Sequence, residues 1–273
     1  MKNPFFSIVL VNYNSGAYLE QALLSVINQD FDDYEFIVVD GGSTDNSVEV
    51  IKKYQDSISW WISEPDKGQS DAFNKGFSKA TGVYYTWINA DDLMLPGTLK
   101  TIHRYIQNHP DCKWITPNTV YIDKNNNILR CNHSIDYPAF IIRHGSLGEL
   151  APSTFFYCDL FKEVGGFVQE YHYNMDDDLW IKFVLSGYNY KRINHWGWAY
   201  RIHEQSKTTG TINGIMDSKI QQEFETIFKA NNHRYSKWAI IMQRLMKCFL
   251  NYPFTICTTL KYKGKDIKLL AEK

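Results

Sequence analysis

The chain has 273 residues, of which 44% are hydrophobic and 22% charged, as is ordinary for one large globular domain with an appendage. No stretch reaches the roughly 18 uninterrupted apolar residues of a membrane-spanning helix. The net charge of −1 is unevenly placed: residues 229–273 carry ten Lys or Arg and two Asp or Glu (+8), whereas the remainder carries 19 and 28 (−9). An acidic body with a basic tail predicts an anionic surface as the partner of the tail.

The five cysteines have neither a CxxC pattern nor a Cys/His spacing typical of metal ligands. An odd number without such spacing predicts reduced thiols in a cytosolic protein. Residues 1–4 run directly into a predicted strand, so we expect no signal peptide and a cytoplasmic location.

The first part of the chain alternates apolar strands with helical spacing. Strands are predicted over residues 5–11, 35–40, 58–63 and 84–88, and helices over residues 18–28, 47–54 and 69–79. This rhythm indicates βαβ units with right-handed crossovers and a parallel sheet. The four strands end at Asn12, Asp40, Glu64 and Asn89, in polar, glycine-rich or acidic turns. We expect these turns to meet at the carboxyl edge of the sheet, where ligands bind in open α/β folds.

The turn Asn89-Ala90-Asp91-Asp92 follows an aromatic strand and places two carboxylates at that edge. Hard divalent cations prefer carboxylate oxygens, and such a cation can hold a diphosphate. The alternative is a solvated acidic turn in which Asp92 caps the next helix. Pro96 and Gly97 are expected to stop any regular element.

The later part of the chain is less regular. Helices are predicted over residues 99–108 and 179–186, and strands over residues 114–123, 128–130, 190–193 and 198–202. In the tail, one helical face collects Trp238, Ile241, Leu245, Met246, Phe249 and Leu250, with Lys237, Arg244 and Lys247 elsewhere around the helix. This pattern predicts either a basic amphipathic helix on a membrane surface or a helix docked on the domain with a solvated basic face.

Four segments in chain order carry a family resemblance. They are residues 7–14 (SIVLVNYN), 38–45 (VVDGGSTD), 64–68 (EPDKG) and 87–92 (WINADD). Together they resemble the family 2 glycosyltransferases with a GT-A fold, over about residues 5–205. The resemblance implies an α/β, Rossmann-like fold with a mixed, mainly parallel sheet flanked by helices. It divides the chain into a glycosyltransferase domain (1–215, with a nucleotide-sugar half 1–97 and an acceptor half 98–215) and a basic helical tail (216–273).

The family's donor site implies roles for five residues. Val11 and Asn12 would line the edge mostly through their backbone, and Asp40 would accept a hydrogen bond from the N–H of a uracil-like ring. The alternative for Asp40 is a capping role at the start of the following helix. Asp66 and Lys67 resemble the segment that contacts ribose and diphosphate, although Lys67 also fits an ordinary exposed lysine.

The resemblance also implies a divalent cation, Mn²⁺ or Mg²⁺. The family motif is often Asp-x-Asp, and here Asn89 holds its first position. Asn offers a neutral oxygen to ribose or to a metal-bound water, so the charge falls on Asp91 as the direct ligand, with Asp92 as a second source. His203, in the segment Tyr200-Arg201-Ile202-His203, resembles a family residue that reaches the diphosphate or the metal.

Residues 173–180 (YNMDDDLW) resemble the acceptor side of the family site, with Met175 in place of the usual Glu. In this register Asp176 matches the general base that deprotonates the acceptor hydroxyl. Asp178 is the competitor, or else the N-cap of a helix from Leu179. Adjacent carboxylates are expected to raise one another's pKa. Core packing is the default for three tryptophans that would otherwise stack on a sugar: Trp180, Trp196 and Trp198.

The implied function is inverting transfer of a sugar from a nucleotide diphosphate sugar, with a UDP-sugar expected, to a hydroxyl of a glycan or lipid-linked oligosaccharide. Bacterial polysaccharide or lipopolysaccharide assembly is the corresponding context, with the tail in peripheral contact with the inner face of the cytoplasmic membrane and no nucleic acid as partner. Two alternatives remain open: a nucleotidyltransferase and a non-catalytic nucleotide-sugar-binding module. Residues 12–16 lack the glycine- and basic-rich phosphate loop of the first, and the second would not need the acidic cluster at Asp176.

Overall fold

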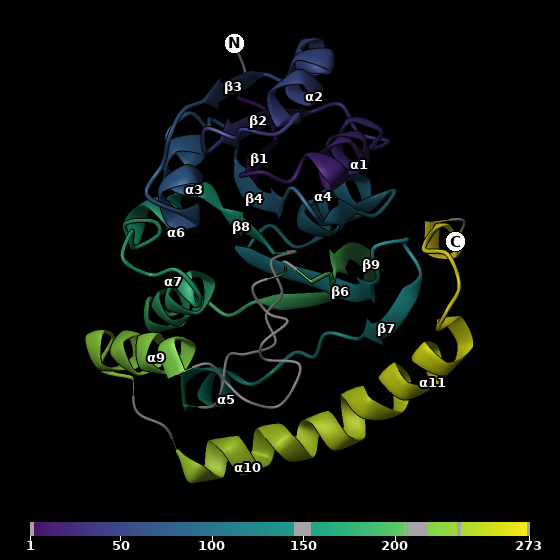
Figure 1. Ribbon diagram of the computed structural model, residues 1–273. Coiled ribbons are helices and arrows are strands. Elements are labelled where there is room, and N and C mark those ends of the chain that lie inside the picture. Colours follow the sequence, from purple (N-terminus) through teal and green to yellow (C-terminus); the bar gives the residue numbers. More distant parts are fainter. Residues whose placement is uncertain (1–2, 145–153, 205, 207–217, 234–235, 272–273) are drawn as a thin grey trace.

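The computed structural model of the chain describes residues 3–144, 154–204, 206, 218–233 and 236–271. Within these residues a nine-stranded sheet has the order β3-β2-β1-β4-β8-β6-β9-β5, and β7 pairs with β6. Helices cover the sheet, and the end of the chain forms an arc below it (Figure 1). The predicted domain boundary at residue 215 lies outside the described residues.

The predicted βαβ half is confirmed. Its elements are β1 (Phe6–Asn12), α1 (Gly16–Ile27), β2 (Tyr34–Asp40), α2 (Ser47–Lys53), the short 3₁₀ helix η1 (Gln55–Ser57), β3 (Trp60–Ser63), α3 (Gln69–Phe77) and β4 (Tyr84–Asn89). The four strands are parallel. Successive residues of β1 point to opposite faces, so Val9 packs in the cluster that contains Phe73 of α3, and Leu10 packs in the cluster that contains Leu23 of α1. Burial on both faces explains why the strand is apolar throughout.

The second half extends the same sheet. Its elements are β5 (Leu93–Met94), α4 (Thr98–Asn108), β6 (Trp114–Ile122), β7 (Ile128–Asn132), α5 (Ala139–His144), β8 (Phe155–Tyr157), α6 (Cys158–Glu163), α7 (Met175–Leu185) and β9 (Lys191–Arg201). β8 lies antiparallel between β4 and β6, and β9 runs parallel to β6. Most paired residues are therefore parallel in a mixed sheet, as the sequence predicted.

Two predicted boundaries were wrong. The strands predicted over 190–193 and 198–202 are one strand, β9. Its register against β6 shifts opposite residues 117–119, which interrupts the regular strand pattern in the sequence of β9. The helix predicted from Leu179 begins at Met175, because negative charge is favourable at a helix N-terminus and the acidic cluster forms its first turn. Pro96 and Gly97 lie in a turn between β5 and α4, as predicted, and Gly97 takes a left-handed conformation (φ 75°) directly before α4.

The tail contains α9 (Ser218–Ala230), α10 (Lys237–Met246), the π-helical turn η2 (Lys247–Asn251), α11 (Tyr252–Tyr262) and α12 (Lys268–Ala271). In the described residues, none of these helices, nor any other, is both long and apolar enough to cross a membrane. All five cysteines carry free thiols, as predicted.

The tail docks on β7 through polar side chains. Thr259 Oγ1 accepts a hydrogen bond from the Cys131 N–H at 3.0 Å, and Thr255 Oγ1 accepts one from the His133 N–H at 3.3 Å. The Asn251 side chain donates to the His133 carbonyl. These contacts satisfy backbone groups of a strand at the margin of the sheet, which would otherwise be open to pairing with another chain.

Candidate active site

The polar ends of the four parallel strands meet at one edge, as predicted. Asn12 pairs with Asp40, Asp40 pairs with Ser63, and Val11 pairs with Asn89 in the sheet register. The backbone of Asn12 continues this edge, since its carbonyl accepts the Gly41 N–H at 2.9 Å. Val11 and Asn12 have little exposed side-chain surface, which fits their predicted role through the backbone.

Asp40 is fully buried at the centre of this edge. Its Oδ1 accepts from Asn12 Nδ2 at 2.6 Å and from the Ser43 hydroxyl, and its Oδ2 accepts from the Ser43 N–H at 2.9 Å and from Ser63 Oγ at 2.6 Å. Burial alone would raise the pKa of Asp40, but the hydrogen bonds from Ser43, Ser63 and Asn12 outweigh it and lower the pKa. Asp40 is therefore held as an anion. It closes the turn at Ser43 and does not cap α2, whose N-cap is Asn46.

The loop that carries Asp66 and Lys67 lies over this turn. A side-chain carbon on Gly41 would come within 2.4 Å of Asp66 Oδ2, so glycine leaves room for the Asp66 carboxylate in its present position. Asp66 Oδ1 accepts the N–H of Gly68 at 2.8 Å. The Lys67 side chain is exposed, while its N–H donates to Asp71 at 3.0 Å. Both predicted residues thus flank the donor edge.

Asp91 and His203 come together from distant parts of the chain. His203 Nε2 lies 3.1 Å from Asp91 Oδ2, and the imidazole ring packs 4.8 Å from the ring of Tyr18. Two adjacent ligands of an octahedral cation with bonds of about 2.1 Å are about 3 Å apart. The pair therefore fits a divalent cation that accepts nitrogen and oxygen ligands. No group of three or more His, Cys, Asp or Glu suited to a metal occurs within the described ranges, so the remaining ligands would be diphosphate oxygens and water.

Asp92 has a different role from its neighbour. It is buried, and it accepts hydrogen bonds from the Arg201 N–H at 3.0 Å, Asn89 Nδ2 at 3.1 Å and Trp198 Nε1 at 3.4 Å. Burial, and then the charge of Asp91, raise the pKa of Asp92 well above its usual range. The predicted alternative of a solvated turn with Asp92 as a helix cap was wrong, because α4 begins only after Gly97.

Arg201 organises the turn that carries Asp91, a role that the sequence analysis missed. Its buried guanidinium donates from Nε to the Asp91 carbonyl at 2.8 Å, from Nη1 to Asn126 Oδ1 at 2.6 Å and from Nη2 to Gln21 Oε1 at 3.1 Å. It also lies 4.9 Å over the ring of Tyr18. The only sequence signal was the Arg-x-His spacing, which drew attention to His203.

The acidic cluster lies in the first turn of α7. Asp178 is buried and is bound to Lys182 at 2.6 Å and to Asn231 at 2.8 Å. Asn174, not Asp178, is the N-cap residue, so the predicted capping role of Asp178 was wrong. These two contacts make Asp178 a structural residue and leave Asp176 as the candidate base.

Asp176 and Asp177 are partly buried. Burial raises the pKa of Asp176 to about 6, against the effect of backbone N–H groups at the helix start and with a further contribution from the charge of Glu223. Burial and the charge of Asp176 raise the pKa of Asp177 well above its usual range. A carboxylate with a pKa of about 6 can accept a proton near neutral pH.

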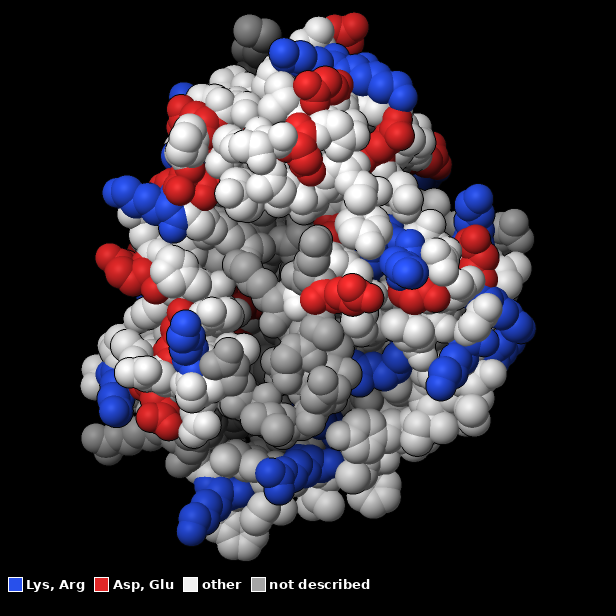
Figure 2. Space-filling model, viewed as in Figure 1, with Lys and Arg blue, Asp and Glu red and all other residues white. Residues whose placement is uncertain are grey.

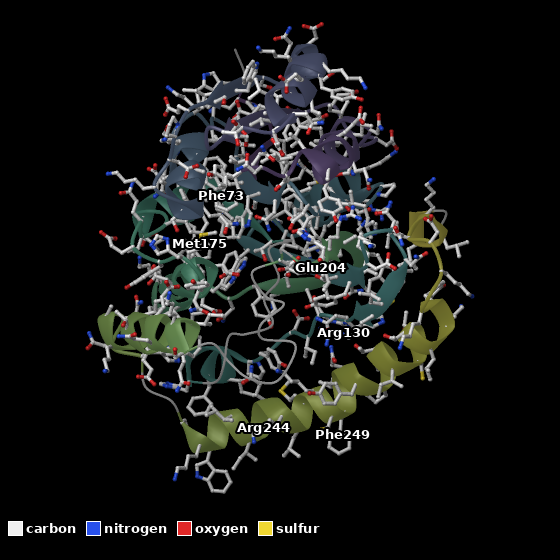
Figure 3. All side chains as sticks on the ribbon, in the orientation of Figure 1. Phe73, Arg130, Met175, Glu204, Arg244 and Phe249 are labelled. Carbon is white, nitrogen blue, oxygen red and sulfur yellow. The ribbon has the colours of Figure 1, made fainter. Side chains whose placement is uncertain are left out.

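The start of α3 connects the two parts of the site. Gln69 Nε2 donates to Asn89 Oδ1 at 2.8 Å, and the neighbouring Ser70 hydroxyl donates to the Tyr171 carbonyl at 2.7 Å and contacts Met175 Sδ at 3.1 Å. Phe73 and Met175 mark this junction between α3 and α7 in Figure 3. Trp180 and Trp198 are buried in the core, as expected by default.

The fold and this edge define an α/β protein of the GT-A class. A solved structure with this arrangement is S. aureus TarS 1–349 in complex with UDP-GlcNAc, with a TM-score of 0.65 and 19% identity over 82% of this chain and 65% of that chain. Another is a mannosyltransferase from Pyrobaculum calidifontis in complex with GDP-Man and Mn²⁺, with a TM-score of 0.59 and 15% identity over 96% of this chain and 80% of that chain. At these identities the likeness concerns the fold.

The sequence comparisons give the family. A profile described as Glycosyl transferase family 2 matches residues 7–162, which is more than half of the chain, and the protein therefore belongs to this family. An uncharacterized glycosyltransferase of Methanocaldococcus jannaschii is 28% identical over 210 residues, which are 74% of this chain and 72% of that protein. One of Rickettsia typhi is 27% identical over 255 residues, or 88% of this chain and 75% of that protein.

Proposed function

We propose that the protein is a metal-dependent, inverting glycosyltransferase that moves a sugar from a nucleotide diphosphate sugar to a hydroxyl of a glycan or lipid-linked acceptor. The observation that carries the proposal is the Asp91–His203 contact at 3.1 Å beside the polar edge formed by Asn12, Asp40 and Ser63. The nucleotide sugars and Mn²⁺ named for TarS and the Pyrobaculum enzyme support a donor of this class. A UDP-sugar is the expected donor.

In this proposal the donor edge holds the nucleotide. The N–H of a uracil-like ring would replace one of the two serine hydroxyls on Asp40, whose carboxylate already accepts four hydrogen bonds. Val11 and Asn12 offer backbone groups, Asp66 and Lys67 lie beside the ribose and diphosphate, and Asn89 faces the ribose or a water on the metal.

Asp91 and His203 would hold Mn²⁺ or Mg²⁺. When bound, the cation neutralises charge that develops on the departing nucleoside diphosphate. Arg201 and Asp92 fix the backbone of the turn, so Asp91 needs little rearrangement to meet the metal.

Asp176 is proposed to take the proton of the acceptor hydroxyl as its oxygen attacks the anomeric carbon. Attack on the face opposite the leaving diphosphate converts an α-linked donor into a β-glycoside. A base whose pKa is about 6 is deprotonated in most molecules at pH 7 and above.

The tail is proposed to contact an anionic membrane surface. Over residues 237–260 its buried residues are polar or small, whereas its exposed residues include many large apolar ones. A helix that docks on a protein in water normally has the opposite arrangement. The buried positions are Ala239, Gln243, Asn251 and Thr255, and the exposed ones are Trp238, Ile241, Met242, Leu245, Phe249, Leu250, Tyr252, Phe254, Ile256 and Leu260. Lys and Arg side chains gather along the same segment at the bottom of Figure 2. A lipid-linked oligosaccharide acceptor in polysaccharide assembly, at the inner face of the cytoplasmic membrane, suits this arrangement.

The first test is a panel of nucleotide sugars with and without Mn²⁺, read out as release of free nucleoside diphosphate. We expect Mn²⁺-dependent release with one UDP-sugar. Tight nucleotide-sugar binding without release, with acceptors supplied, would instead identify a binding module, and release of pyrophosphate would identify a nucleotidyltransferase. Turnover that is unaffected by a strong chelator contradicts the metal role of Asp91.

A further inference from the structure

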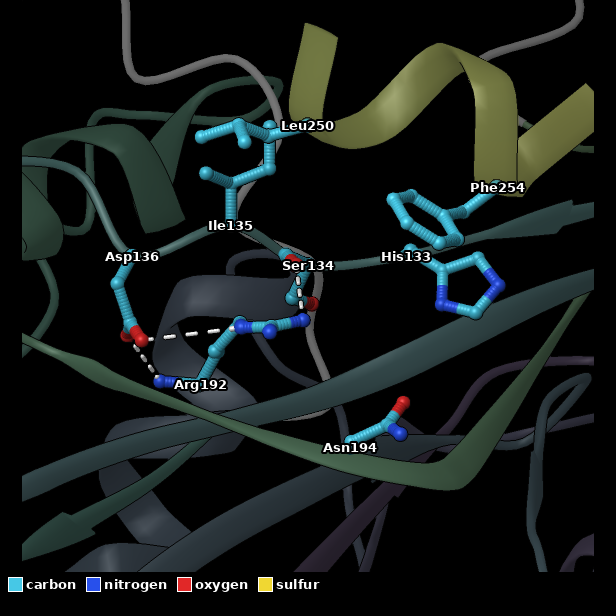
Figure 4. Close-up of a pocket in the computed structure, with 8 residues that line it drawn as sticks. All are labelled: His133, Ser134, Ile135, Asp136, Arg192, Asn194, Leu250 and Phe254. Atoms are coloured by element: carbon cyan, nitrogen blue, oxygen red, sulfur yellow. Dashed lines mark hydrogen bonds and ion pairs between the residues drawn. The ribbon is translucent and has the colours of Figure 1, made fainter. Parts of the chain in front are cut away.

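A cavity of about 500 Å³ lies between the tail and the sheet (Figure 4). Its lining combines residues 133–136 after β7, Arg192 and Asn194 of β9, and Leu250 and Phe254 of the tail. A volume of this size holds a small amphipathic molecule. None of these residues belongs to the proposed reaction site.

The cavity is remote from the reaction edge. Arg192 is near the start of β9, and Arg201, which supports the metal-site turn, is at its end. The register shifts in β9, and the matching stretch of β6, from Thr116 to Ile122, has six residue steps and spans about 20 Å. A small molecule in the cavity therefore does not reach the proposed metal pair, and we treat the cavity as a site separate from that pair.

The charged lining consists of one cation and one anion that stand side by side. Arg192 Nε lies 3.7 Å from Asp136 Oδ2, at the outer limit of an ion pair, and the two side chains are 42% and 51% exposed. The backbone N–H of Arg192 donates to Asp136 Oδ1 at 2.6 Å, and Arg192 Nη1 donates to the Ser134 carbonyl at 3.3 Å. These hydrogen bonds fix the positions of the Asp136 carboxylate and the Arg192 guanidinium. Burial, and then the charge of Arg192, lower the pKa of His133, which leaves that ring neutral at pH 7.

One side of the cavity is apolar. Leu250 and Phe254 line it from the tail and are also 51% and 59% exposed, so they lie between the cavity and the exposed apolar face of the tail. In Figure 4 they project from the tail above Ile135 and His133, and Arg192 and Asp136 lie below, on the side of the cavity away from the tail. A ligand with charges at one end and hydrocarbon at the other matches this order.

We propose that the cavity binds the phosphoethanolamine headgroup of a membrane lipid. The phosphate pairs with Arg192, whose guanidinium suits phosphate oxygens, the ammonium pairs with Asp136, and the acyl chains leave past Leu250 and Phe254 into the bilayer. This proposal rests on the membrane contact proposed for the tail. The bound headgroup would fix the orientation of the tail helices on the membrane surface, while their exposed apolar side chains insert into the lipid.

The headgroup is tested in solution with the full chain, by calorimetry with monomeric short-chain phosphatidylethanolamine, the matching phosphatidylglycerol and inorganic phosphate. We expect the ethanolamine lipid to bind most tightly. Arg192→Gln is expected to weaken it about tenfold, since a charged hydrogen bond is lost, and Arg192→Lys to weaken it less. Asp136→Asn is expected to remove the preference for ethanolamine over glycerol. Arg130→Gln, which removes the same charge from exposed Arg130 of β7, is the matched control and should bind as wild type.

Equal affinity for the two lipids, or binding of inorganic phosphate as tight as that of the lipid, overturns the proposal, as does unchanged binding by Arg192→Gln. Thermal unfolding of each variant checks its folding, and Asp136→Asn provides an independent test if Arg192→Gln is unstable. The Trp238→Glu/Phe249→Glu variant separates this proposal from the membrane contact. It should lose vesicle flotation and keep headgroup affinity in solution, so a failure of flotation alone counts against the tail and not against the cavity.

Discussion

The donor edge and the start of α7 both contain buried or partly buried aspartates, but their surroundings shift the aspartate pKa in opposite directions. At the donor edge, Asp40 accepts four hydrogen bonds and its pKa is lowered despite burial. In α7, Asp176 and Asp177 stand next to each other, and burial raises the pKa of both. The same residue type is therefore kept as a fixed anion in one region and as a proton acceptor near neutral pH in the other.

The two regions differ in the number of hydrogen-bond donors that reach each carboxylate. Asp40 ends a strand whose neighbours end in Asn12 and Ser63, and Ser43 lies in the turn that follows, so three side chains converge on it. Asp176 meets backbone N–H groups at one helix start, and the acidic residue beside it has only burial and a neighbouring charge acting on its pKa. Environments that push pKa values apart separate binding groups from acid–base groups. Four predictions, made with three substitutions, test this division.

The largest effect is expected at the metal pair. Asp91→Asn removes the negative charge that faces His203, and we expect kcat/KM to fall by roughly 10³-fold because transition-state charge on the leaving diphosphate is no longer balanced. The measurement is nucleotide release over a Mn²⁺ titration. Asp30→Asn, which alters an exposed aspartate paired with Lys100, is the control and should keep the wild-type titration. An Asp91→Asn variant with the wild-type Mn²⁺ dependence would assign the metal to other residues.

Asp176→Asn is expected to lower kcat by about 10²-fold, since it removes the proposed base but not the donor site. In the wild-type protein, activity should rise with pH through about 6 as Asp176 loses its proton. The variant's residual activity should lack this rise. The control is Asp178→Asn, which disturbs the contacts with Lys182 and Asn231 and should reduce stability more than it alters the pH profile. If the pH profile of activity changes in Asp178→Asn and not in Asp176→Asn, Asp178 is the base and Asp176 the structural residue.

Asp40→Asn is expected to raise the KM for the nucleotide sugar about tenfold, with a smaller change in kcat, because a charge-assisted hydrogen bond to the base is lost. Steady-state kinetics with the sugar nucleotide varied give this split. Glu49→Gln, on the neighbouring helix α2, serves as a control that leaves the edge intact. A change confined to kcat would place Asp40 in the chemistry and remove the contrast between the two regions.

Much of the donor half follows from local sequence. Continuous apolar runs identify β1 and β2, and the residues directly after them identify the edge, because parallel strands end together. The contact between Asp91 and His203 agrees with the residues chosen from the family motifs. Their metal role itself stays a proposal.

The remainder depends on tertiary contacts that leave little local signal. The turn that contains Asp92 has a composition typical of a solvated turn. In the structure Asp92 is buried against Trp198 and the backbone of Arg201, which are more than 100 residues away in the sequence. The tail has an ordinary amphipathic pattern, and only its docking through Thr255 and Thr259 reveals that the apolar side faces outward. Side-chain periodicity gives the width of an apolar face and not the direction in which it points.

The smallest expected effect concerns stability, and its sign depends on pH. The pKa of Asp176 is raised from 3.8 to about 6 in the folded state, so its ionisation opposes folding progressively as the pH rises from about 4 to about 6. Asp176→Asn removes this cost, and we expect it to raise the free energy of unfolding at pH 8 by on the order of 1 kcal/mol, with little change at pH 4. Asp40→Asn should do the reverse, because a lowered pKa contributes stability above the unfolded value that is lost in acid. Urea unfolding of both variants at the two pH values measures the difference. If both variants are destabilised at pH 8, burial is not what raises the pKa of Asp176, and the two aspartates are held alike.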